Sequence, residues 1–309
     1  MKYNQWLTEW LENFVKPTAK QRTYERYTDI INQHIIGELG DYEMNMLTPL
    51  VLQHFTMRLL KSGNLITGKG LSTSYVNTIV TVIQNSLRTA YAAGQLDEYC
   101  ADKIKRPKNV EKKVVCFTDV EQKKIEDFVL NSGKPRLFGI VICLYTGIRV
   151  GELLALEWTD VDFERGTICV DKCVRDKFDE GKMLRMSDSP KTAQSIRLIP
   201  LPKQLKPWLK TMYRQSTSKY VIESSMGEPV YVRAYQRSFE RCLNKLNIPH
   251  RGFHALRHTF ATRALECGMD IKTLAEILGH KNASVTLSRY VHSMLSHKRE
   301  MMNNLGKIF

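Results

Sequence analysis

The stretch LGHKNASVTLSRY, residues 278–290, is the most specific signal in this sequence. It contains a glycine followed by His280, and Tyr290 stands ten residues after that histidine. Two further motifs precede it, TGIRVGE at residues 146–152 and HALRH at residues 254–258. A tyrosine hydroxyl is a weak nucleophile, so fixed cations around it would stabilise the charge that develops when it attacks a phosphodiester. Each motif is common by itself, but their joint order is not expected by chance.

The HALRH motif has the spacing of an anion site on a helix. His254 and Arg257 are three residues apart, so on a helix they project from the same face. A helix that begins near Phe253 would place both in its first turns, where free amide groups and the helix dipole favour an anion. The alternative is a surface helix that happens to carry a histidine and an arginine.

The sequence does not predict a metal site. His254 and His258 are four residues apart, as in zinc-protease helices, but residue 255 is alanine where the general-base glutamate would stand. His258 is therefore expected to be packed or hydrogen-bonded. The seven cysteines are scattered, and Cys169 and Cys173 lack a second Cys or His pair at zinc-finger spacing, so reduced thiols are expected.

Arg149 lies within an apolar segment, from Tyr145 to Leu156. An arginine in such surroundings needs a partner or an anionic ligand, and its planar guanidinium suits bidentate contact with a phosphate. Glu152, three residues further on, is the alternative partner. The two interpretations are compatible, because Glu152 can orient a guanidinium that also binds a substrate.

The first hundred residues show helical periodicity. Apolar residues recur at helical spacing from Trp6 to Phe14 and again from Tyr24 to Ile31. Thr48-Pro49 and Ser72 are typical helix starts, because each offers a capping hydroxyl and the first places proline at the first helical position. We predict a small helical domain at residues 1–102.

A basic segment, residues 103–116, follows this domain. Pro107 prevents a helix through its middle. The segment is either a solvated tether or a strap that lies along DNA phosphates, where each neutralised phosphate releases counterions. Its candidate DNA-binding residues are Lys103, Lys105, Arg106, Lys108, Lys112 and Lys113.

Residues 117–309 have a mixed pattern. Phe117-Thr118-Asp119 is a helix start, and the apolar segment 137–145 predicts a buried helix that leads into Gly147. The expected strands are Thr167–Val170, Met183–Met186 and Ser195–Leu201, the last marked by Ile196, Leu198 and Ile199. The expected later helices include Arg237–Leu246, Leu256–Leu265, Ile271–Leu278 with Asp270 as its cap, and one after Tyr290. The predicted fold class is mainly α with a small antiparallel β-sheet.

These motifs, in this order, resemble the active site of the tyrosine recombinases, the phage integrase family. The resemblance covers nearly the whole chain. Residues 1–102 resemble the helical core-binding domain of these enzymes, and residues 117–309 resemble their mixed α+β catalytic domain. The front half is most similar to integrases of mobile elements. Many of those have a further N-terminal arm-binding domain, whereas this sequence begins directly in the core-binding pattern.

The resemblance implies a role for each motif residue. Tyr290 would attack the scissile phosphate, form a 3′-phosphotyrosine and free a 5′-hydroxyl. The residues that would stabilise charge on the non-bridging oxygens are Arg149, Arg257 and His280. His254 would handle a proton at the attacking tyrosine and contact the phosphate, and Glu152 would support Arg149.

Lys191 is assigned by the resemblance and not by its spacing. The family has a lysine on a β-hairpin between the first arginine and the His-x-x-Arg motif. SPKT at residues 189–192, followed by RLIPL at residues 197–201, resembles that hairpin. Lys191 would then be the general acid for the departing 5′-oxygen. By spacing alone it would be a solvated turn lysine. The less well placed competitors are Lys172, Lys177 and Lys182.

The charge of the chain favours a nucleic-acid partner. The net charge is +14 and the sequence pI is about 9.4. Residues 1–107 contribute only +2 of this charge, so the excess lies in the part that carries the motifs. A basic protein of this kind favours a polyanion. No apolar run approaches membrane-spanning length and no apolar signal stretch begins the chain, so a cytoplasmic, nucleoid-associated protein is expected.

The resemblance implies site-specific recombination of double-stranded DNA, with integration or excision of a mobile element favoured. It implies no metal, ATP or other cofactor. Four protomers would act on two duplexes, whereas the free protein can be a monomer, and participation of accessory DNA-bending proteins stays open. The apolar C-terminal tail is expected to dock on a neighbouring protomer or on its own domain. The rival functions are a type IB topoisomerase and a DNA-binding regulator with a dormant site. All six catalytic positions are filled, which argues against the regulator.

Overall fold

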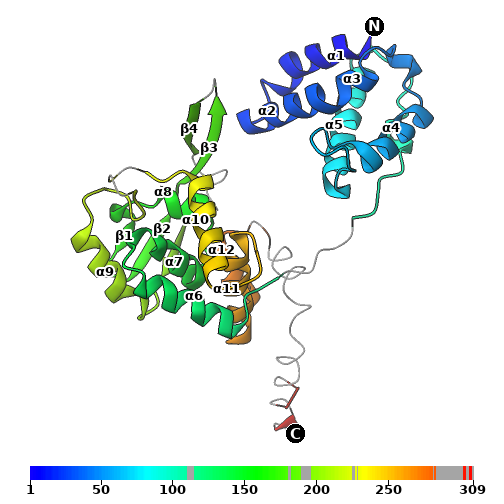
Figure 1. Ribbon diagram of the computed structural model, residues 1–309. Coiled ribbons are helices and arrows are strands. Elements are labelled where there is room, and N and C mark those ends of the chain that lie inside the picture. The colour runs from blue at the N-terminus through cyan, green and yellow to red at the C-terminus, as the bar shows by residue number, and fades with distance from the viewer. Residues whose placement is uncertain are drawn as a thin grey trace. The chain divides into compact units, whose positions relative to one another are not determined.

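The computed structural model describes residues 1–109, 115–179, 182–188, 196–224, 227, 229–280, 282, 302–303 and 306–307. The chain divides into two units, Met1–Lys112 and Lys113–Phe309, each with its own hydrophobic core (Figure 1). The predicted fold class, mainly α with a small antiparallel sheet, is confirmed. None of the described helices has the length and apolar character needed to cross a bilayer.

The first unit is helical. Its helices are α1 (Tyr3–Trp10), α2 (Gln21–Ile30), α3 (Ile36–Leu39), α4 (Pro49–Ser62) and α5 (Thr73–Ala92), with π-helical turns at Leu11–Val15 and Ile31–Ile35 and 3-10 turns at Met44–Met46 and Ala101–Lys103. The predicted helix starts are confirmed. The Thr48 hydroxyl accepts from the Val51 amide at 3.3 Å, and the Ser72 hydroxyl accepts from the Tyr75 amide at 3.3 Å. These caps fix where α4 and α5 begin.

The start of the basic segment packs on this unit. The Lys105 amide donates to Gln53 Oε1 at 2.9 Å. The Arg106 guanidinium donates to the Thr81 hydroxyl at 3.1 Å and also to the Gln84 side chain. Residues 105 and 106 are therefore attached to α4 and α5 and are not part of a free tether. Lys103 forms an exposed ion pair with Glu98, the side chains of Lys105 and Lys108 are exposed, and Lys112 and Lys113 lie outside the described residues.

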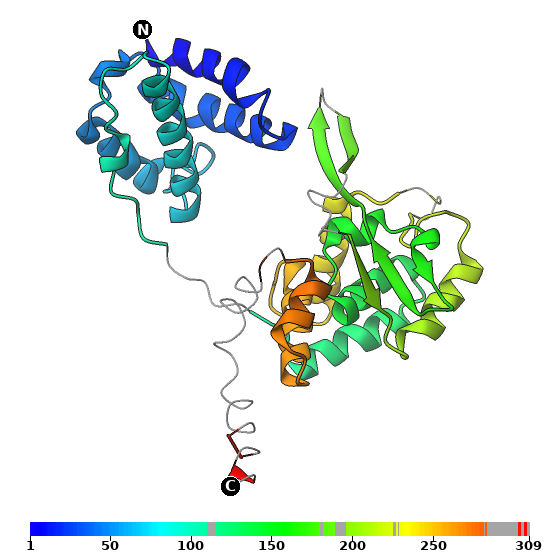
Figure 2. The same cartoon turned by 180° about the vertical axis from the view of Figure 1, so that it is seen from behind.

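The second unit combines helices and strands. Its helices are α6 (Asp119–Asn131), α7 (Phe138–Thr146), α8 (Val150–Ala155), α9 (Leu205–Gln215), α10 (Val232–Lys245), α11 (His254–Glu266) and α12 (Ile271–Leu278), with 3-10 turns at Pro135–Leu137 and Trp158–Asp160. Its strands are β1 (Val161–Asp162), β2 (Thr167–Val170), β3 (Cys173–Asp179), β4 (Lys182–Asp188) and β5 (Arg197–Pro200). The predicted start of α6 is confirmed, with Thr118 as its cap, and so is the predicted cap Asp270 of α12. Figures 1 and 2 show α9 at the edge of this unit away from α11 and α12.

The strands form two separate antiparallel sheets. One has the order β1-β2-β5, and the other is the β3–β4 hairpin, which projects from the unit (Figure 2). The sequence predicted β2, β4 and β5 but missed β1 and β3. β1 has only two residues, and β3 is the charged run CVRDKFD, whose pairing with β4 is not marked by an apolar period.

The inward face of β5 carries only one of the three apolar residues that marked this strand in the sequence. The prediction used Ile196 and Leu198 as apolar markers of this strand, yet these side chains are 54% and 63% exposed. Arg197 and Ile199 face inward instead, at 9% and 2% exposure. Side chains alternate along a strand, so the register of β5 against β2 decides which set is buried.

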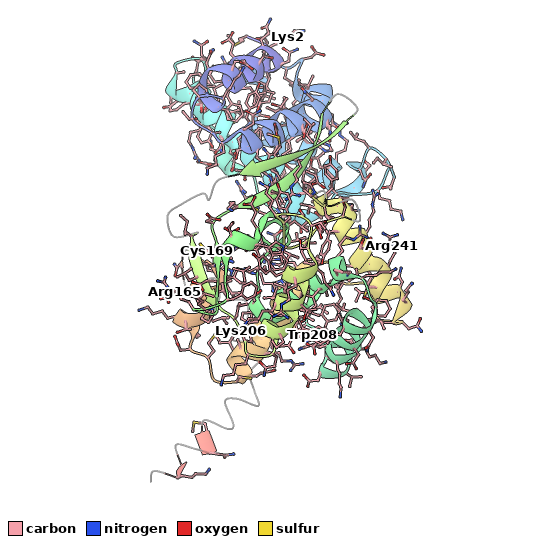
Figure 3. All side chains as sticks on the ribbon, turned by 90° about the vertical axis from the view of Figure 1, so that its left-hand side faces the viewer. Lys2, Arg165, Cys169, Lys206, Trp208 and Arg241 are labelled. Carbon is pink, nitrogen blue, oxygen red and sulfur yellow. The ribbon has the colours of Figure 1, made fainter. Side chains whose placement is uncertain are left out.

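A short turn connects β1 and β2. Asp162 Oδ1 accepts from the amides of Glu164 and Arg165 at 2.9 and 2.8 Å, which folds the chain back. Gly166 follows with φ +68°, and a Cβ atom there would collide with the side chain of Lys206. Lys206 belongs to α9, and Figure 3 shows it near Arg165 on the side of the unit formed by that helix. The turn thus brings α9 close to the sheet.

Asp176 of β3 holds the hairpin to the start of α10. Its carboxylate accepts from the amides of Val232 and Arg233 at 3.0 and 2.9 Å. Asp176→Ala removes both bonds and a negative charge at a helix N-terminus, so the second unit should lose about 1–2 kcal/mol. Urea unfolding measures this loss. The control is Asp127→Ala, an exposed carboxylate within α6, for which a change below about 0.5 kcal/mol is expected. Equal losses in the two variants would contradict the capping role.

Candidate active site

The turn after α7 positions the first motif. α7 is apolar on all sides and buried, as predicted, and it ends at Gly147 in the left-handed conformation, with φ +65°. A Cβ atom on Gly147 would lie within 3 Å of the side chains of Phe260 and Leu278. Glycine is needed here both for its backbone conformation and for the close approach of α11 and α12. Two residues later Arg149 stands immediately before α8.

Glu152 is the partner of Arg149, as the sequence suggested. Its Oε2 atom accepts from the Arg149 amide at 2.9 Å and its Oε1 atom accepts from Arg149 Nη1 at 2.8 Å. The carboxylate of Glu152 therefore both caps the start of α8 and orients the guanidinium of Arg149. The Arg149 side chain is 38% exposed, whereas the Glu152 side chain is 9% exposed. Part of the arginine side chain is therefore accessible to solvent.

Arg197 of β5 binds the same carboxylate. Its Nη2 atom lies 2.8 Å from Glu152 Oε2 and its Nη1 atom lies 3.3 Å from Glu152 Oε1. Burial by itself would raise the pKa of Glu152. The hydrogen bond and charge of Arg197, with the charge of Arg149, outweigh that effect and lower the pKa to about 2. Glu152 is thus a carboxylate at neutral pH.

Arg257 lies at the buried centre of the site. α11 begins at His254, directly after Phe253 as predicted, and Arg257 in its first turn is only 2% exposed. Its Nη1 atom donates to the Gly147 carbonyl at 2.8 Å, and its Nη2 atom donates to the Leu278 carbonyl at 2.6 Å. These bonds join α11 and the end of α12 to the turn after α7, which lies more than a hundred residues earlier in the sequence.

His280 faces Arg257. The chain leaves α12 through Gly279, with φ +64°, and the His280 amide donates to the Ala275 carbonyl at 2.9 Å. His280 Nε2 lies 2.9 Å from Arg257 Nη2. A guanidinium has no acceptor, so His280 Nε2 accepts this hydrogen bond and carries no proton in this arrangement. We call the five residues Glu152, Arg149, Arg197, Arg257 and His280 the Glu152 network.

Of the other three predicted catalytic residues, the structure describes only His254. His254 is exposed at the start of α11, and its ring stands edge-on to that of His258 at 4.7 Å between centroids. Lys191 and Tyr290 lie outside the described residues. Lys172, a competitor for the lysine role, has its ammonium 3.1 Å from Asp160 and 3.5 Å from Glu157. Within the described ranges, no group of three or more His, Cys, Asp or Glu residues could hold a metal ion.

Arg197 is the residue that sequence reasoning missed. It was noted only as part of a strand, because a single arginine in a strand is usually a solvated residue. The available signal was its position two residues before Ile199, which places both on one face of β5. The network thus contains three arginines and one carboxylate, an excess of positive charge that suits a bound anion.

Residues 116–297, more than half of the chain, match the phage integrase family. The chain belongs to this family. Residues 2–60 match the N-terminal SAM-like domain of phage integrases, so both units contain a family segment.

Curated relatives of this chain are recombinases, integrases and transposases by name. A tyrosine recombinase XerC-like protein of Caldanaerobacter subterraneus subsp. tengcongensis is 28% identical, covering 97% of this chain and 81% of the relative. The ICEBs1 integrase of Bacillus subtilis is 26% identical, covering 94% and 79% of the two chains. The transposase from transposon Tn916 of Enterococcus faecalis is 27% identical over 54% of this chain.

Solved structures share the fold. The Tn1549 transposon integrase in complex with a circular intermediate DNA has a TM-score of 0.82 at 23% identity, covering 99% of each chain. A lambda integrase dimer bound to a COC′ core site has a TM-score of 0.69 at 20% identity, covering 92% of this chain and 97% of the other. The tyrosine recombinase fold is therefore kept at low sequence identity.

Replacement of Glu152 tests the charge balance of the site. Glu152→Gln leaves buried guanidinium charge without its carboxylate, so the second unit should be about 3–5 kcal/mol less stable at neutral pH. The pKa of Glu152 falls from 4.5 to about 2 on folding. Its stabilising effect is therefore complete above pH 4.5 and is lost as the pH falls through about 2.

The stability difference between wild type and Glu152→Gln should thus narrow as the pH is lowered below 4.5. Urea unfolding of both proteins at neutral pH and at two pH values below 4.5 measures this difference. A difference that stays constant or grows with acidification would show that Glu152 is not the ionised partner of these arginines.

Proposed function

We propose that this protein is a site-specific recombinase of the integrase type, which cuts and rejoins double-stranded DNA through a covalent 3′-phosphotyrosine at Tyr290. The observation that carries the proposal is the Glu152 network, in which the buried guanidinium of Arg257 holds His280 at 2.9 Å and Glu152 orients Arg149. This arrangement fixes the guanidinium donors of Arg149 and Arg257 for the non-bridging oxygens of a phosphate. Such donors act best in a site where they are already oriented before the reaction.

The proposed cleavage step is a transesterification. The Tyr290 oxygen forms a bond to phosphorus as the bond to the 5′-oxygen breaks, and the tyrosine proton passes to the imidazole of His254. Lys191 gives a proton to the departing 5′-oxygen. Charge on the non-bridging oxygens is stabilised by Arg149, Arg257 and His280. The phosphodiester is exchanged for a phosphotyrosine ester, so ATP is not needed.

The second step reverses the first with a different strand. A 5′-hydroxyl from the partner DNA attacks the phosphotyrosine and releases Tyr290. Exchange between two duplexes requires four protomers, so we propose a tetramer on DNA, with accessory DNA-bending proteins as optional partners. The names of the relatives, among them the ICEBs1 integrase and the Tn916 transposase, favour integration and excision of a mobile element in the cytoplasm, at the nucleoid.

A nicked duplex that carries a candidate element end tests the chemistry. After cleavage the short 5′-hydroxyl fragment diffuses away, so the covalent protein–DNA adduct accumulates. Wild type should form an adduct that withstands denaturation, and Tyr290→Phe should form none because it lacks the attacking oxygen. Mapping the cut also identifies the recombination site.

The outcomes separate the rival functions. An adduct that reseals only its own strand, at sites without sequence preference, would favour a type IB topoisomerase. Absence of any adduct over a panel of element ends, with specific DNA binding retained in wild type and Tyr290→Phe alike, would favour a dormant regulator.

Replacement of the leaving oxygen tests Lys191. Lys191→Ala should slow cleavage by about 100-fold or more, as expected for loss of a general acid. A substrate with bridging sulfur at the 5′ position should restore the rate, because a thiolate, whose conjugate acid has a pKa of about 8.5, departs without a proton.

The control for this test is Lys172→Ala. Lys172 is ion-paired to Asp160 and Glu157, so its loss should give a cleavage defect, if any, that sulfur does not rescue. Rescue by sulfur in Lys172→Ala but not in Lys191→Ala would move the acid role from one lysine to the other.

A further inference from the structure

Arg197 connects two parts of the Glu152 network. Its side chain is 7% exposed and comes from β5, which is distant in sequence from both α8 and α12. Its two terminal nitrogens bind Glu152 at 2.8 and 3.3 Å, while its Nε atom donates to the Ile277 carbonyl at 2.6 Å. One guanidinium therefore joins the carboxylate that orients Arg149 to the last turn of α12.

The end of α12 is held by two arginines. Arg197 holds the Ile277 carbonyl, and Arg257 holds the next carbonyl, that of Leu278, at 2.6 Å. Carbonyls in the last turn of a helix lack partners within the helix and lie at the negative end of its dipole. Guanidiniums from β5 and α11 thus satisfy consecutive carbonyls of the turn that leads into His280.

Gly279 allows Arg197 to approach this turn. An ideal Cβ atom on Gly279 would lie 3.0 Å from Arg197 Nη1 and 3.2 Å from its Cδ atom. Any larger residue would push against the guanidinium as well as being strained at φ +64°. The backbone of His280 therefore starts from a turn against which Arg197 packs directly.

We propose that Arg197 is a positioning residue for the recombination reaction. Through Glu152 it fixes the guanidinium of Arg149, and through the Ile277 carbonyl it fixes the turn that places His280 beside Arg257. Arg197 itself does not touch the phosphate. The effect of Arg197 on the reaction rate rests on the function proposed above. Its effect on the position of His280 can be tested without that function.

Lysine at position 197 is the informative replacement. It keeps the positive charge opposite Glu152. Its single ammonium, however, cannot form the bidentate contact with the carboxylate and at the same time donate to the Ile277 carbonyl. The matched control is Arg263→Lys in α11. Arg263 is also paired to carboxylates, Asp119 and Glu266, and donates to the Phe117 carbonyl at 3.4 Å, but none of these bonds involves the α12 turn.

The kinetic readout is single-turnover formation of the Tyr290 adduct on saturating nicked DNA. Arg197→Lys should cleave about 10- to 100-fold more slowly, the loss expected when catalytic groups are misplaced by about 1 Å. Its DNA dissociation constant should stay close to that of wild type. Arg263→Lys should cleave at the wild-type rate per folded molecule, with thermal unfolding used to measure the folded fraction of each variant.

The spectroscopic readout needs no DNA. In protein labelled with ¹³C and ¹⁵N at histidine, the ring signals of His280 are assigned with His280→Gln. Arg197→Lys should shift these signals and Arg263→Lys should not, a difference that a general loss of stability would not produce. If wild type forms no adduct, the proposed function fails, and the His280 signals still decide whether Arg197 positions this ring.

A double variant covers the case in which Arg197→Lys does not fold. Glu152→Gln with Arg197→Gln replaces the ion pair by two neutral amides, and it should show both the slow cleavage and the shifted His280 signals. Wild-type rate and wild-type His280 signals in either folded variant would overturn the proposal. So would a rate loss in Arg197→Lys equal to that in Arg263→Lys.

Discussion

One buried carboxylate holds the site together. Glu152 receives hydrogen bonds from the backbone and side chain of Arg149 and from the guanidinium of Arg197. Burial alone would favour its neutral form, and only the adjacent guanidiniums keep it ionised. In turn, the negative charge of Glu152 stabilises the guanidiniums of Arg149 and Arg197 in a largely apolar part of the protein. The site thereby keeps a positive excess, in which Arg149 and Arg197 share one carboxylate and Arg257 is held by backbone carbonyls. That excess suits the phosphate that we propose as its ligand.

Two left-handed glycines complement this charge balance. Gly147 ends α7 and Gly279 ends α12, and each lies against a side chain that a Cβ atom would displace. The carbonyl of Gly147 accepts from Arg257, and the turn at Gly279 packs on Arg197. Glycine is thus required at two places where arginine and backbone meet closely. Donors held in this way do not have to reorganise when charge develops on a substrate.

The fold provides the framework and the site provides the chemistry. Integrase structures with only 20–23% identity keep the same arrangement of helices and strands, because a core tolerates many apolar substitutions that keep its pattern. In this chain the network draws on α8, β5, α11 and the end of α12, and long segments separate α8 from β5 and β5 from α11. These charges therefore meet only in the folded core of the second unit.

Local sequence was enough to predict the helix starts and the pairing of Arg149 with Glu152. These features depend on residues within a few positions of one another, such as Thr48 and Val51 or Arg149 and Glu152. Only the tertiary structure decided that Arg197, and not Ile196 or Leu198, faces inward, and that Arg257 is buried beside His280. Those outcomes depend on strand register and on helix ends brought together in space. The spacing of Arg197 and Ile199 places both on one face of β5, but it does not say which face is buried.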